Sequence, residues 1–342
     1  MKKFYGKWIL LVITAVMMTL TAGCGGKDSG AAAESGKKLI IYTSMKESLI
    51  GGIVDGFKKK YPDIAIDYQS AGAGKLMEKI AAELQGGHIQ ADVIWTSEVP
   101  DFYFLKQEGL LEKFRPSDFN EVLNPFDDYD GSFTAARLGT LGIVVNIDHV
   151  NVLPNAWEDI ATQAAYKNSF GIADPALSGT SFMSIALLEK QFGWSYIERL
   201  RANGAVKSKG SGQVVDDTAA GTLNACLGVD YITASRIDKG AHLEMVYPKE
   251  LLMVPSPIAI FKDSKNMDSA KLFVDYVLTR EAQQKVAEAG TIPVRSDVKM
   301  PEKYNLPTPD DALRNGIHVD YAEVLSHKNE TIQKFSELFD TP

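Results

Sequence analysis

The sequence is poor in the residue types on which most catalytic and metal sites depend. Only two cysteines occur, Cys24 and Cys226, and their contexts are unrelated, so neither a disulfide framework nor a thiolate metal site is predicted. The five histidines are scattered without the spacing of metal ligands, and the Gly-x-Ser-x-Gly motif of serine hydrolases does not occur. The sequence therefore predicts no enzyme, no metal site and no cofactor.

An excess of positive charge is also missing. Lys and Arg number 36 against 44 Asp and Glu, which gives a net charge of −8, and no basic block could follow a phosphate backbone. Nucleic acid is therefore not an expected partner. Hydrophobic residues make up 45% and charged residues 23% of the chain, which excludes disorder, and 342 residues exceed what one core usually holds.

The apolar run of the N-terminal segment is too short to span a membrane. Its apolar run, Ile9 to Leu20, has about twelve residues where a spanning helix needs ~20. The run follows a basic start and leads into small residues, so residues 1–23 are predicted to be a signal peptide. Residues 24–38 show no hydrophobic period and predict a flexible tether, and no later apolar run is long enough to span a membrane.

The end of this segment, Leu20-Thr21-Ala22-Gly23-Cys24, resembles the signal of bacterial lipoproteins. The resemblance implies that Cys24 becomes the lipid-modified (palmitate-bearing) N-terminus after cleavage. Thr21 departs from the pattern, since leucine is more usual there, and ordinary secretory cleavage nearby is the alternative. Lipidation would hold the protein on the outer face of the cytoplasmic membrane, in a periplasm or at the cell surface.

The remainder alternates between strand and helix patterns. Three strand-then-helix units follow one another between Leu39 and Gly109, and further units follow the apolar stretch Leu138 to Asn146. Near the end, one long amphipathic helix is predicted to close at Gly290. This order predicts an α/β protein whose sheets are mainly parallel and flanked by helices.

The economical arrangement is two lobes with a ligand cleft between them. The chain is predicted to cross from the first lobe near residue 143 and to return near residue 252, and two crossings form a hinge. The predicted parts are a first lobe of residues 39–142 and 252–300, a second lobe of residues 143–251, and a C-terminal helical segment of residues 301–342.

Four loops that each follow a strand and precede a helix carry hydroxyl groups and small residues. Such loops present unpaired amides at the positive end of a helix dipole, and ligands of open α/β sheets bind at the carboxyl ends of strands. For any single loop, Ser or Thr as an ordinary helix N-cap is the alternative. Hydroxyls and amides without an accompanying Lys or Arg favour an oxyanion held by hydrogen bonds. The candidate residues are Thr43, Ser44, Ser70, Gly72, Ala73, Thr96, Ser97, Ser178, Gly179 and Thr180.

One of these loops, AGAGK, invites a phosphate-loop interpretation that fails. The motif requires Gly where Gln69 stands and Ser or Thr where Leu76 stands.

Several segments together resemble one protein family. They are YTSMKESL (42–49), SAGAGKL, ADVIWTSE (91–98), LGIVVN (141–146), DPALSGTSF (174–182), VYPKE and VPSPIAIF. The chain resembles the extracellular solute-binding proteins of bacterial ABC importers, in the branch that contains ferric-ion, phosphonate and sugar-phosphate binders. The resemblance, from about Leu39 to about Pro301, implies a two-lobed type II binding fold that closes over a small solute and delivers it to a membrane permease.

Within that branch, ferric binders carry a carboxylate where Glu98 stands and a pair of adjacent tyrosines after a segment like Gly228-Val229-Asp230. Here Tyr231 stands alone and the chain has no Tyr-Tyr pair, so direct ferric coordination is in doubt. Asp217, Asp230, Tyr231 and Glu244 are candidates for binding the remainder of the solute, or are structural.

The function predicted is that of a lipid-anchored, monomeric receptor for a small anionic solute, with a phosphonate or phosphate ester favoured. Its partners are the solute, the permease subunits of an ABC importer and the membrane. A ferric-ion or other small-anion receptor of the same class is the alternative. A secreted enzyme or a scaffold lipoprotein is the alternative outside transport. The sequence does not name the solute.

Overall fold

The computed structural model describes residues 37–126 and 129–340. The predicted signal peptide, Cys24 and most of the predicted tether lie outside the described residues. The described chain forms two sheets. The first has, in spatial order, the strands β2 (Ile64–Ser70), β1 (Lys37–Thr43), β3 (Val93–Trp95), β11 (Ser256–Ile260) and β4 (Thr134–Arg137). The second has β10 (Leu252–Met253), β5 (Thr140–Asn146), β8 (Ala225–Val229), β6 (Phe170–Ala173) and β7 (Val206–Ser208), with β9 (Leu243–Val246) also paired to β5.

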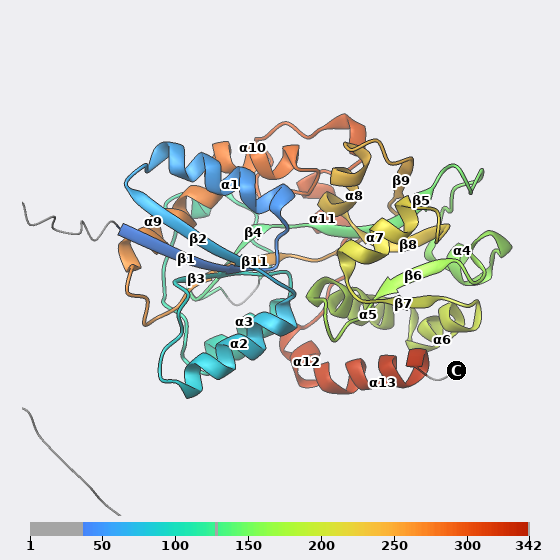
Figure 1. Ribbon diagram of the computed structural model, residues 1–342, viewed down its shortest axis with the longest axis horizontal. Helices are drawn as coiled ribbons and strands as arrows, with labels where there is room; N and C mark the ends of the chain where they lie inside the picture. Colours follow the sequence, from blue (N-terminus) through green and yellow to red (C-terminus); the bar gives the residue numbers. More distant parts are fainter. Residues whose placement is uncertain (1–36, 127–128, 341–342) are drawn as a thin grey trace, which may run out of the picture. The chain divides into compact units, whose positions relative to one another are not determined.

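Helices cover both faces of each sheet (Figure 1). Their bounds are α1 (Glu47–Lys60), α2 (Ala73–Gln85), α3 (Val99–Gln107), α4 (Trp157–Thr162), α5 (Gly179–Phe192), α6 (Trp194–Ala202), α7 (Ser211–Ala219), α8 (Asp230–Ile237), α9 (Met267–Leu278), α10 (Arg280–Glu288), α11 (Pro309–Asn315), α12 (Tyr321–Ser326) and α13 (Lys328–Asp340). Single 3-10 turns lie at Phe119–Glu121, Ala164–Tyr166 and Glu302–Tyr304. None of the helices in the described ranges combines the length and apolar content that a membrane crossing requires.

Helix α1 illustrates how the apolar pattern selects the buried face. Leu49, Ile50, Ile53, Val54 and Phe57 recur at helical spacing, and all five are buried against the first sheet and its helices. Three lysines in the last turn complement the negative end of the helix dipole. The apolar positions recognised in the sequence are therefore the ones that pack α1 against the first sheet.

The predicted α/β fold of two helix-flanked sheets is confirmed, but the sheets are mixed rather than mainly parallel. Strands joined through helices are parallel, as in β1 with β2 and β3 and β6 with β7 and β8. Strands next to the passages between the sheets are antiparallel, as in β11 with β3 and β4 and β5 with β8, β9 and β10. A parallel pair needs a long crossover, whereas β5 and β11, one of which belongs to each antiparallel pair, enter their sheets directly from the other sheet.

Two passages run directly between strands of the two sheets. The chain leaves the first sheet after β4 through Leu138 and Gly139, and it returns after β10 through Val254 and Pro255. These positions differ by a few residues from those expected near 143 and 252. Gly139 has a φ of +56°, a conformation that favours glycine, and it separates β4 from the apolar run of β5.

The long helix predicted to end at Gly290 is two helices. Thr279 leaves the helical conformation (φ −62°, ψ 154°), and its hydroxyl accepts a hydrogen bond from the Ala282 amide at 3.3 Å. The apolar period continues across this break, so the sequence pattern did not reveal it. Thr279 is thus the N-cap of α10.

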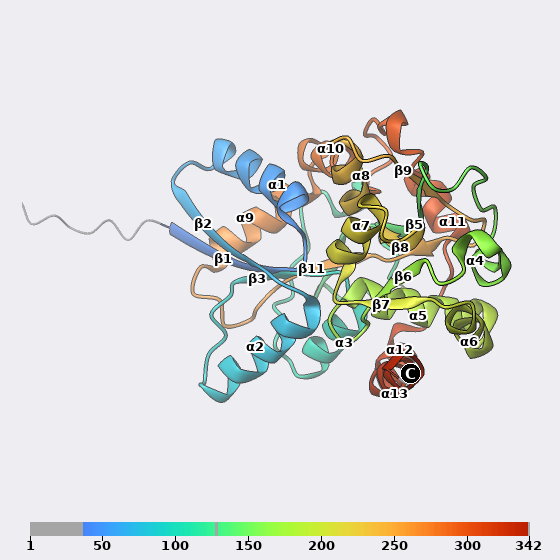
Figure 2. The ribbon, with the colours of Figure 1, turned by 45° about the vertical axis from the view of Figure 1, so that its right-hand side comes forward.

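The C-terminal segment contains α11, α12 and α13, and it contacts elements of both sheets. Helix α12 packs against α3, which follows β3 of the first sheet, whereas α13 packs against α5 and α6 of the second (Figure 2). In α13 the apolar contacts come from Phe335 and Phe339, whose rings stack with centroids 4.2 Å apart.

Candidate functional site

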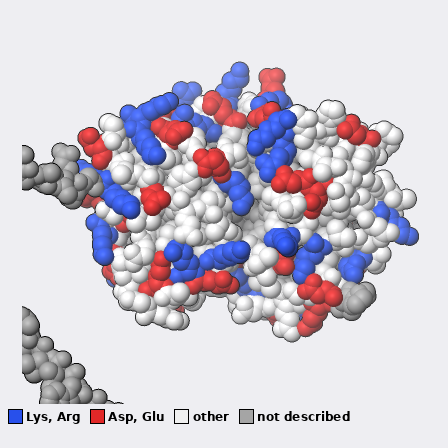
Figure 3. Space-filling model, viewed as in Figure 1, with Lys and Arg blue, Asp and Glu red and all other residues white. Residues whose placement is uncertain are grey.

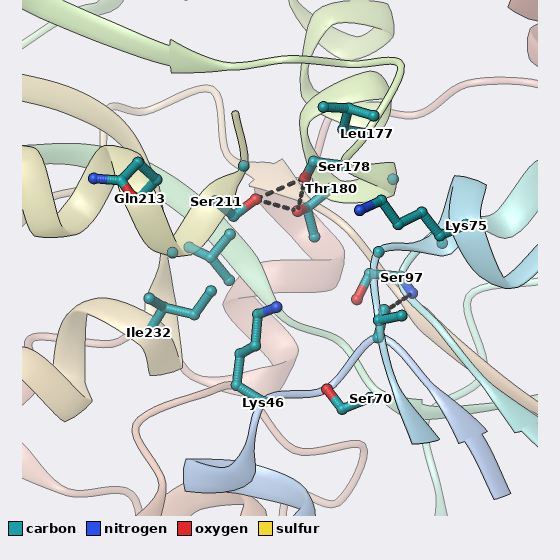
Figure 4. A pocket seen from close by; sticks show the side chains of 18 of the residues that line it. Lys46, Ser70, Lys75, Ser97, Leu177, Ser178, Thr180, Ser211, Gln213 and Ile232 are labelled. Carbon is teal, nitrogen blue, oxygen red and sulfur yellow. Dashed lines mark hydrogen bonds between the residues drawn. The ribbon is translucent and has the colours of Figure 1, made fainter. Parts of the chain in front are cut away.

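A cavity of about 520 Å³ lies where loops at the carboxyl ends of strands from both sheets meet (Figure 4). The face shown in Figure 3 is hollowed near its middle, with Lys or Arg side chains beside the hollow. The loops of the first sheet line the cavity with Ser44, Lys46, Ser70, Ala71, Gly72, Ala73, Lys75 and Ser97. The second sheet contributes Leu177, Ser178, Gly179, Thr180, Lys209, Gly210, Ser211, Gly212, Gln213, Val229, Tyr231 and Ile232.

Three hydroxyls form a triangle on the second-sheet side of the cavity. Ser178 Oγ lies 2.7 Å from Ser211 Oγ and 3.0 Å from Thr180 Oγ1, and Thr180 Oγ1 lies 3.0 Å from Ser211 Oγ (Figure 4). Ser178 is the N-cap of α5, where it accepts a hydrogen bond from Ser181, and Ser211 opens α7. The triangle therefore joins the positive ends of two helices, an arrangement that suits an anion.

Hydroxyls of the first sheet face this triangle across the cavity. Ser44 Oγ accepts a hydrogen bond from the Ser97 amide at 3.1 Å, and Ser70 donates to the Met45 carbonyl oxygen at 2.7 Å. The Ser97 hydroxyl is buried, lies 2.9 Å from Ser256 Oγ, and accepts a hydrogen bond from Arg137 at 3.2 Å. These bonds fix the three loops relative to one another.

Three lysines also line the cavity, which corrects the expectation of loops without Lys or Arg. Lys46 comes from the β1–α1 loop, Lys75 from the first turn of α2, and Lys209 from the loop between β7 and α7. In Figure 4 the labelled Lys46 and Lys75 point into the cavity. The sequence contained the signal, because Lys46 stands two residues after Ser44 and Lys75 belongs to AGAGK.

The β7–α7 loop is a fifth strand-to-helix loop that the sequence analysis missed. It brings Lys209, Gly210, Ser211, Gly212 and Gln213 to the cavity. Because β7 has only three residues, its apolar pattern is too short to mark a strand. The Lys-Gly-Ser-Gly sequence ahead of a helical pattern was the available signal.

Glycines allow the loops of the two sheets to approach closely. A side chain at Gly72, the N-cap of α2, would overlap the carbonyl oxygen of Leu177, and one at Gly74 would lie 2.9 Å from that of Ala176. Gly179 is similarly covered by the side chain of Glu98. Backbone of the second sheet's loop thus packs directly on the start of α2.

Nine of the residues predicted for the site line the cavity, and six do not: Thr43, Thr96, Glu98, Asp217, Asp230 and Glu244. Thr43 is fully buried beneath the loop, where it donates to the Trp95 carbonyl oxygen at 2.8 Å and accepts from the Met45 amide at 3.0 Å. Thr96 is also buried. Glu244 lies half-buried on β9, paired with Val145 of β5. Those that line it are Ser44, Ser70, Gly72, Ala73, Ser97, Ser178, Gly179, Thr180 and Tyr231.

Glu98 belongs to a buried charge cluster next to the cavity. Lys328, the first residue of α13, forms ion pairs with Glu98 and, at 2.7 Å, with Asp101 of α3. Burial raises the pKa of Glu98 from 4.5 to about 8; the charge of Asp101 adds to this, and Lys328 opposes it. Burial also raises the pKa of Asp101. Burial disfavours the Lys328 ammonium, but the two carboxylates outweigh it and raise its pKa.

Asp230 is the centre of a second buried network, at the passage between the sheets. It pairs with Arg137 at 3.1 Å and accepts hydrogen bonds from the Thr140 amide at 2.9 Å and from the Thr291 hydroxyl at 2.5 Å. Its carboxylate is therefore satisfied within the protein.

Tyr231 lines the cavity, and both its hydroxyl and its ring contact neighbouring residues. Its hydroxyl accepts a hydrogen bond from the Lys46 amide at 3.1 Å, and the Arg137 guanidinium lies 5.0 Å from its ring centroid. Burial raises the pKa of Tyr231, so its phenol stays neutral. Across residues 37–126 and 129–340, no group of three or more His, Cys, Asp or Glu side chains is placed to hold a metal ion.

Comparisons with known proteins agree with the fold. Residues 90–323 match a family model described as "Bacterial extracellular solute-binding protein". The chain is 24% identical over 256 residues to the "Putative 2-aminoethylphosphonate-binding periplasmic protein" of Salmonella typhimurium, covering 71% of this chain and 73% of that protein.

Two solved structures share the fold. The periplasmic binding protein AfuA of Actinobacillus pleuropneumoniae, with fructose-6-phosphate bound, has a TM-score of 0.76 and 24% identity, with 89% of this chain and 99% of that chain covered. Iron-bound HitA of Pseudomonas aeruginosa has a TM-score of 0.73 and 21% identity, with 87% and 99% covered.

Proposed function

This chain belongs to the family of bacterial extracellular solute-binding proteins, and from that premise we propose that its cavity captures a small phosphorus-containing anion, a phosphonate or a phosphate ester. Proteins of this family deliver small solutes to the permease subunits of ABC importers. In this proposal the chain is a receptor without catalytic turnover.

The observation that carries the proposal is the set of donors around the cavity. The N-termini of α2, α5 and α7 border it, together with hydroxyls from both sheets and the ammonium groups of Lys46, Lys75 and Lys209. A tetrahedral oxyanion has several oxygens, each of which accepts hydrogen bonds, so donors on opposite walls can bind it together. The names of the Salmonella relative and of the AfuA complex support a phosphorus group.

Ferric ion is a less suitable solute for this cavity. The carboxylate of Glu98 is paired with Lys328, and the Tyr231 hydroxyl already accepts a hydrogen bond from Lys46. The positive charges of the three cavity lysines would repel a ferric ion in the same space. Tight ferric binding without affinity for phosphonates or phosphate esters would replace our proposal with the ferric alternative.

Binding by both walls gives a simple mechanism of capture. The chain connects the two sheets at residues 138–139 and 254–255, so the lobes can rotate about these passages. An anion that bridges the Ser178–Thr180–Ser211 triangle and the loops of the first sheet stabilises the closed arrangement. The closed receptor is then the form presented to the permease.

Calorimetric titration tests the site. Losing one hydrogen bond to a charged group costs ~1.5–3 kcal/mol, so Ser178→Ala and Thr180→Val should each weaken binding of the best phosphonate by roughly 10- to 150-fold. Thr308→Ala is the matched control, because Thr308 caps α11, accepts from the Asp311 amide at 3.1 Å, and is not among the residues that line the cavity. The control should lose ~1 kcal/mol of stability without losing affinity.

If the site variants bind like the wild type and lose only stability, their hydroxyls are structural caps and the oxyanion site lies elsewhere.

We also propose that the receptor is anchored through a lipid on Cys24, in keeping with the lipoprotein-like end of its predicted signal peptide. Cells fed an alkyne-modified fatty acid should label the wild type but not Cys24→Ser. Labelling of the Cys24→Ser variant, or no labelling of the wild type, would contradict the proposed lipid anchor.

A further inference from the structure

The three cavity lysines come from separate loops and give the cavity a positive lining. Lys46, Lys75 and Lys209 form no ion pair with a carboxylate within the described part of the chain. Their neighbour Lys207 differs, since it pairs with Asp174 at 3.4 Å and with Asp340 at 2.6 Å. The positive charge of the three cavity lysines is therefore available to a solute.

Three carboxylates on elements that border the cavity are already engaged. Glu98 pairs with Lys328 and is covered by Gly179, whereas Asp230 pairs with Arg137. Gln213 lines the cavity, and its side-chain amide donates a hydrogen bond to the Asp217 carboxylate at 2.7 Å. A cationic group on the solute would meet the lysines and find these carboxylates occupied.

Charge balance then defines the solute more closely. A phosphate ester carries close to two negative charges at neutral pH and an alkylphosphonate between about one and two, against three ammonium groups and the positive ends of α2, α5 and α7. At least one positive charge remains uncompensated. The cavity volume of about 520 Å³ leaves room for more than the phosphorus group.

We propose that the cavity selects phosphorus anions that carry a second negative group, and that it discriminates against those that carry an ammonium. This inference rests on the proposed function and adds the chemistry of the rest of the solute. It sets this chain apart from the relative whose name refers to 2-aminoethylphosphonate.

Three phosphonates of similar size test the inference. Phosphonoacetate, ethylphosphonate and 2-aminoethylphosphonate each have two carbons and end in a carboxylate, a methyl and an ammonium group. Calorimetric titration at pH 7.5 and low salt should give affinities in that order, with about tenfold or more between the first and the last. The difference should shrink at high salt, because ions screen the lysines.

Lysine variants identify the source of the selectivity. Lys46→Gln, Lys75→Gln and Lys209→Gln should narrow the difference between phosphonoacetate and 2-aminoethylphosphonate, and Lys209→Glu should favour the latter. Lys239→Gln changes the net charge equally at an exposed position beyond α8 and should leave the order unchanged. Melting temperatures of all variants establish that they fold.

The outcomes separate the two proposals. If the phosphonates bind but 2-aminoethylphosphonate binds as tightly as phosphonoacetate or more tightly, the charge selectivity is overturned and the receptor function stands. Selectivity that survives all of the lysine substitutions overturns the assignment to these residues. If neither phosphonates nor phosphate esters bind, the proposed function fails, and this inference fails with it.

Discussion

Lys328 is the ion-pair partner of two carboxyl groups that the fold buries. Glu98 and Asp101 are 2% and 3% exposed, and both pair with the Lys328 ammonium. Removing one partner of a buried ion pair leaves the other charge without compensation, which costs far more than the loss of a surface pair. We therefore expect Lys328→Met to lower the free energy of unfolding by about 3–5 kcal/mol.

Urea denaturation measures this loss, and the same helix supplies the control. Lys334 pairs with Glu330 at 3.0 Å on an exposed face of α13, so Lys334→Met should leave the urea midpoint nearly unchanged. Similar losses in the two variants would mean that the cluster around Glu98 is not what stabilises the helix.

The raised pKa of Glu98 predicts a pH dependence of stability. Because the folded state binds a proton on Glu98 more tightly than the unfolded state, this residue contributes stability that is complete below about pH 4.5. That contribution is lost as the pH rises from there through about 8. The urea midpoint of the wild type should fall over this range more steeply than that of Glu98→Gln, which cannot ionise. If the urea midpoints of the wild type and of Glu98→Gln change with pH in parallel, the pKa of Glu98 is not raised in the folded state.

Individual residues also mark what the sequence could and could not predict. Hydroxyls that cap helices after strands were predictable, because capping and anion binding require the same residue types at the same place. The sequence shows Lys46 and Lys75 beside these loops, but the direction of their side chains depends on how the loops and helices are oriented in the fold, which no local pattern reports. The contact between Asp101 and Lys328 joins positions 227 residues apart, and no local pattern reports it.

At the scale of elements, the meeting of α2 with the loop before α5 can be tested. Gly72 has φ −60° and ψ 147°, a conformation open to any residue, so Gly72→Ala strains only the contact with Leu177. That contact joins loops of the two sheets. We expect the substitution to weaken solute binding by about tenfold, ~1.4 kcal/mol, with little change in the urea midpoint.

Gly52→Ala is the matched control for this experiment. Gly52 lies exposed within α1, where an added side chain meets nothing within 4 Å. The substitution should stabilise the protein by ~0.5–1 kcal/mol without changing affinity. Unaltered affinity in Gly72→Ala would mean that the two loops need not touch when solute binds.

Elements were predictable in type and order more than in direction and extent. Alternating strand and helix patterns indicated the α/β class, since each unit has its own apolar period. Strand direction depends on where the chain passes from sheet to sheet, and Gly139 and Pro255 mark those passages only in retrospect. The three residues of β7 are too few to show a period.

At the scale of the whole molecule, solute should change both shape and stability. Phosphonoacetate at 100 times its dissociation constant should add ~2.7 kcal/mol to the free energy of unfolding. Small-angle scattering should show a smaller radius of gyration with solute than without, because the lobes close about the two passages. Stabilisation with an unchanged radius, in a protein shown to open without solute, would argue against hinged closure.

Lys328 has a further consequence for the order in which the protein becomes functional. A chain that crosses a membrane from its N-terminus delivers Glu98 and Asp101 long before Lys328, the residue with which both pair. The support beneath the loops around the cavity is complete only when α13 has arrived and docked. We therefore expect an unfinished chain to bind no solute, so that occupancy of the cavity reports complete export.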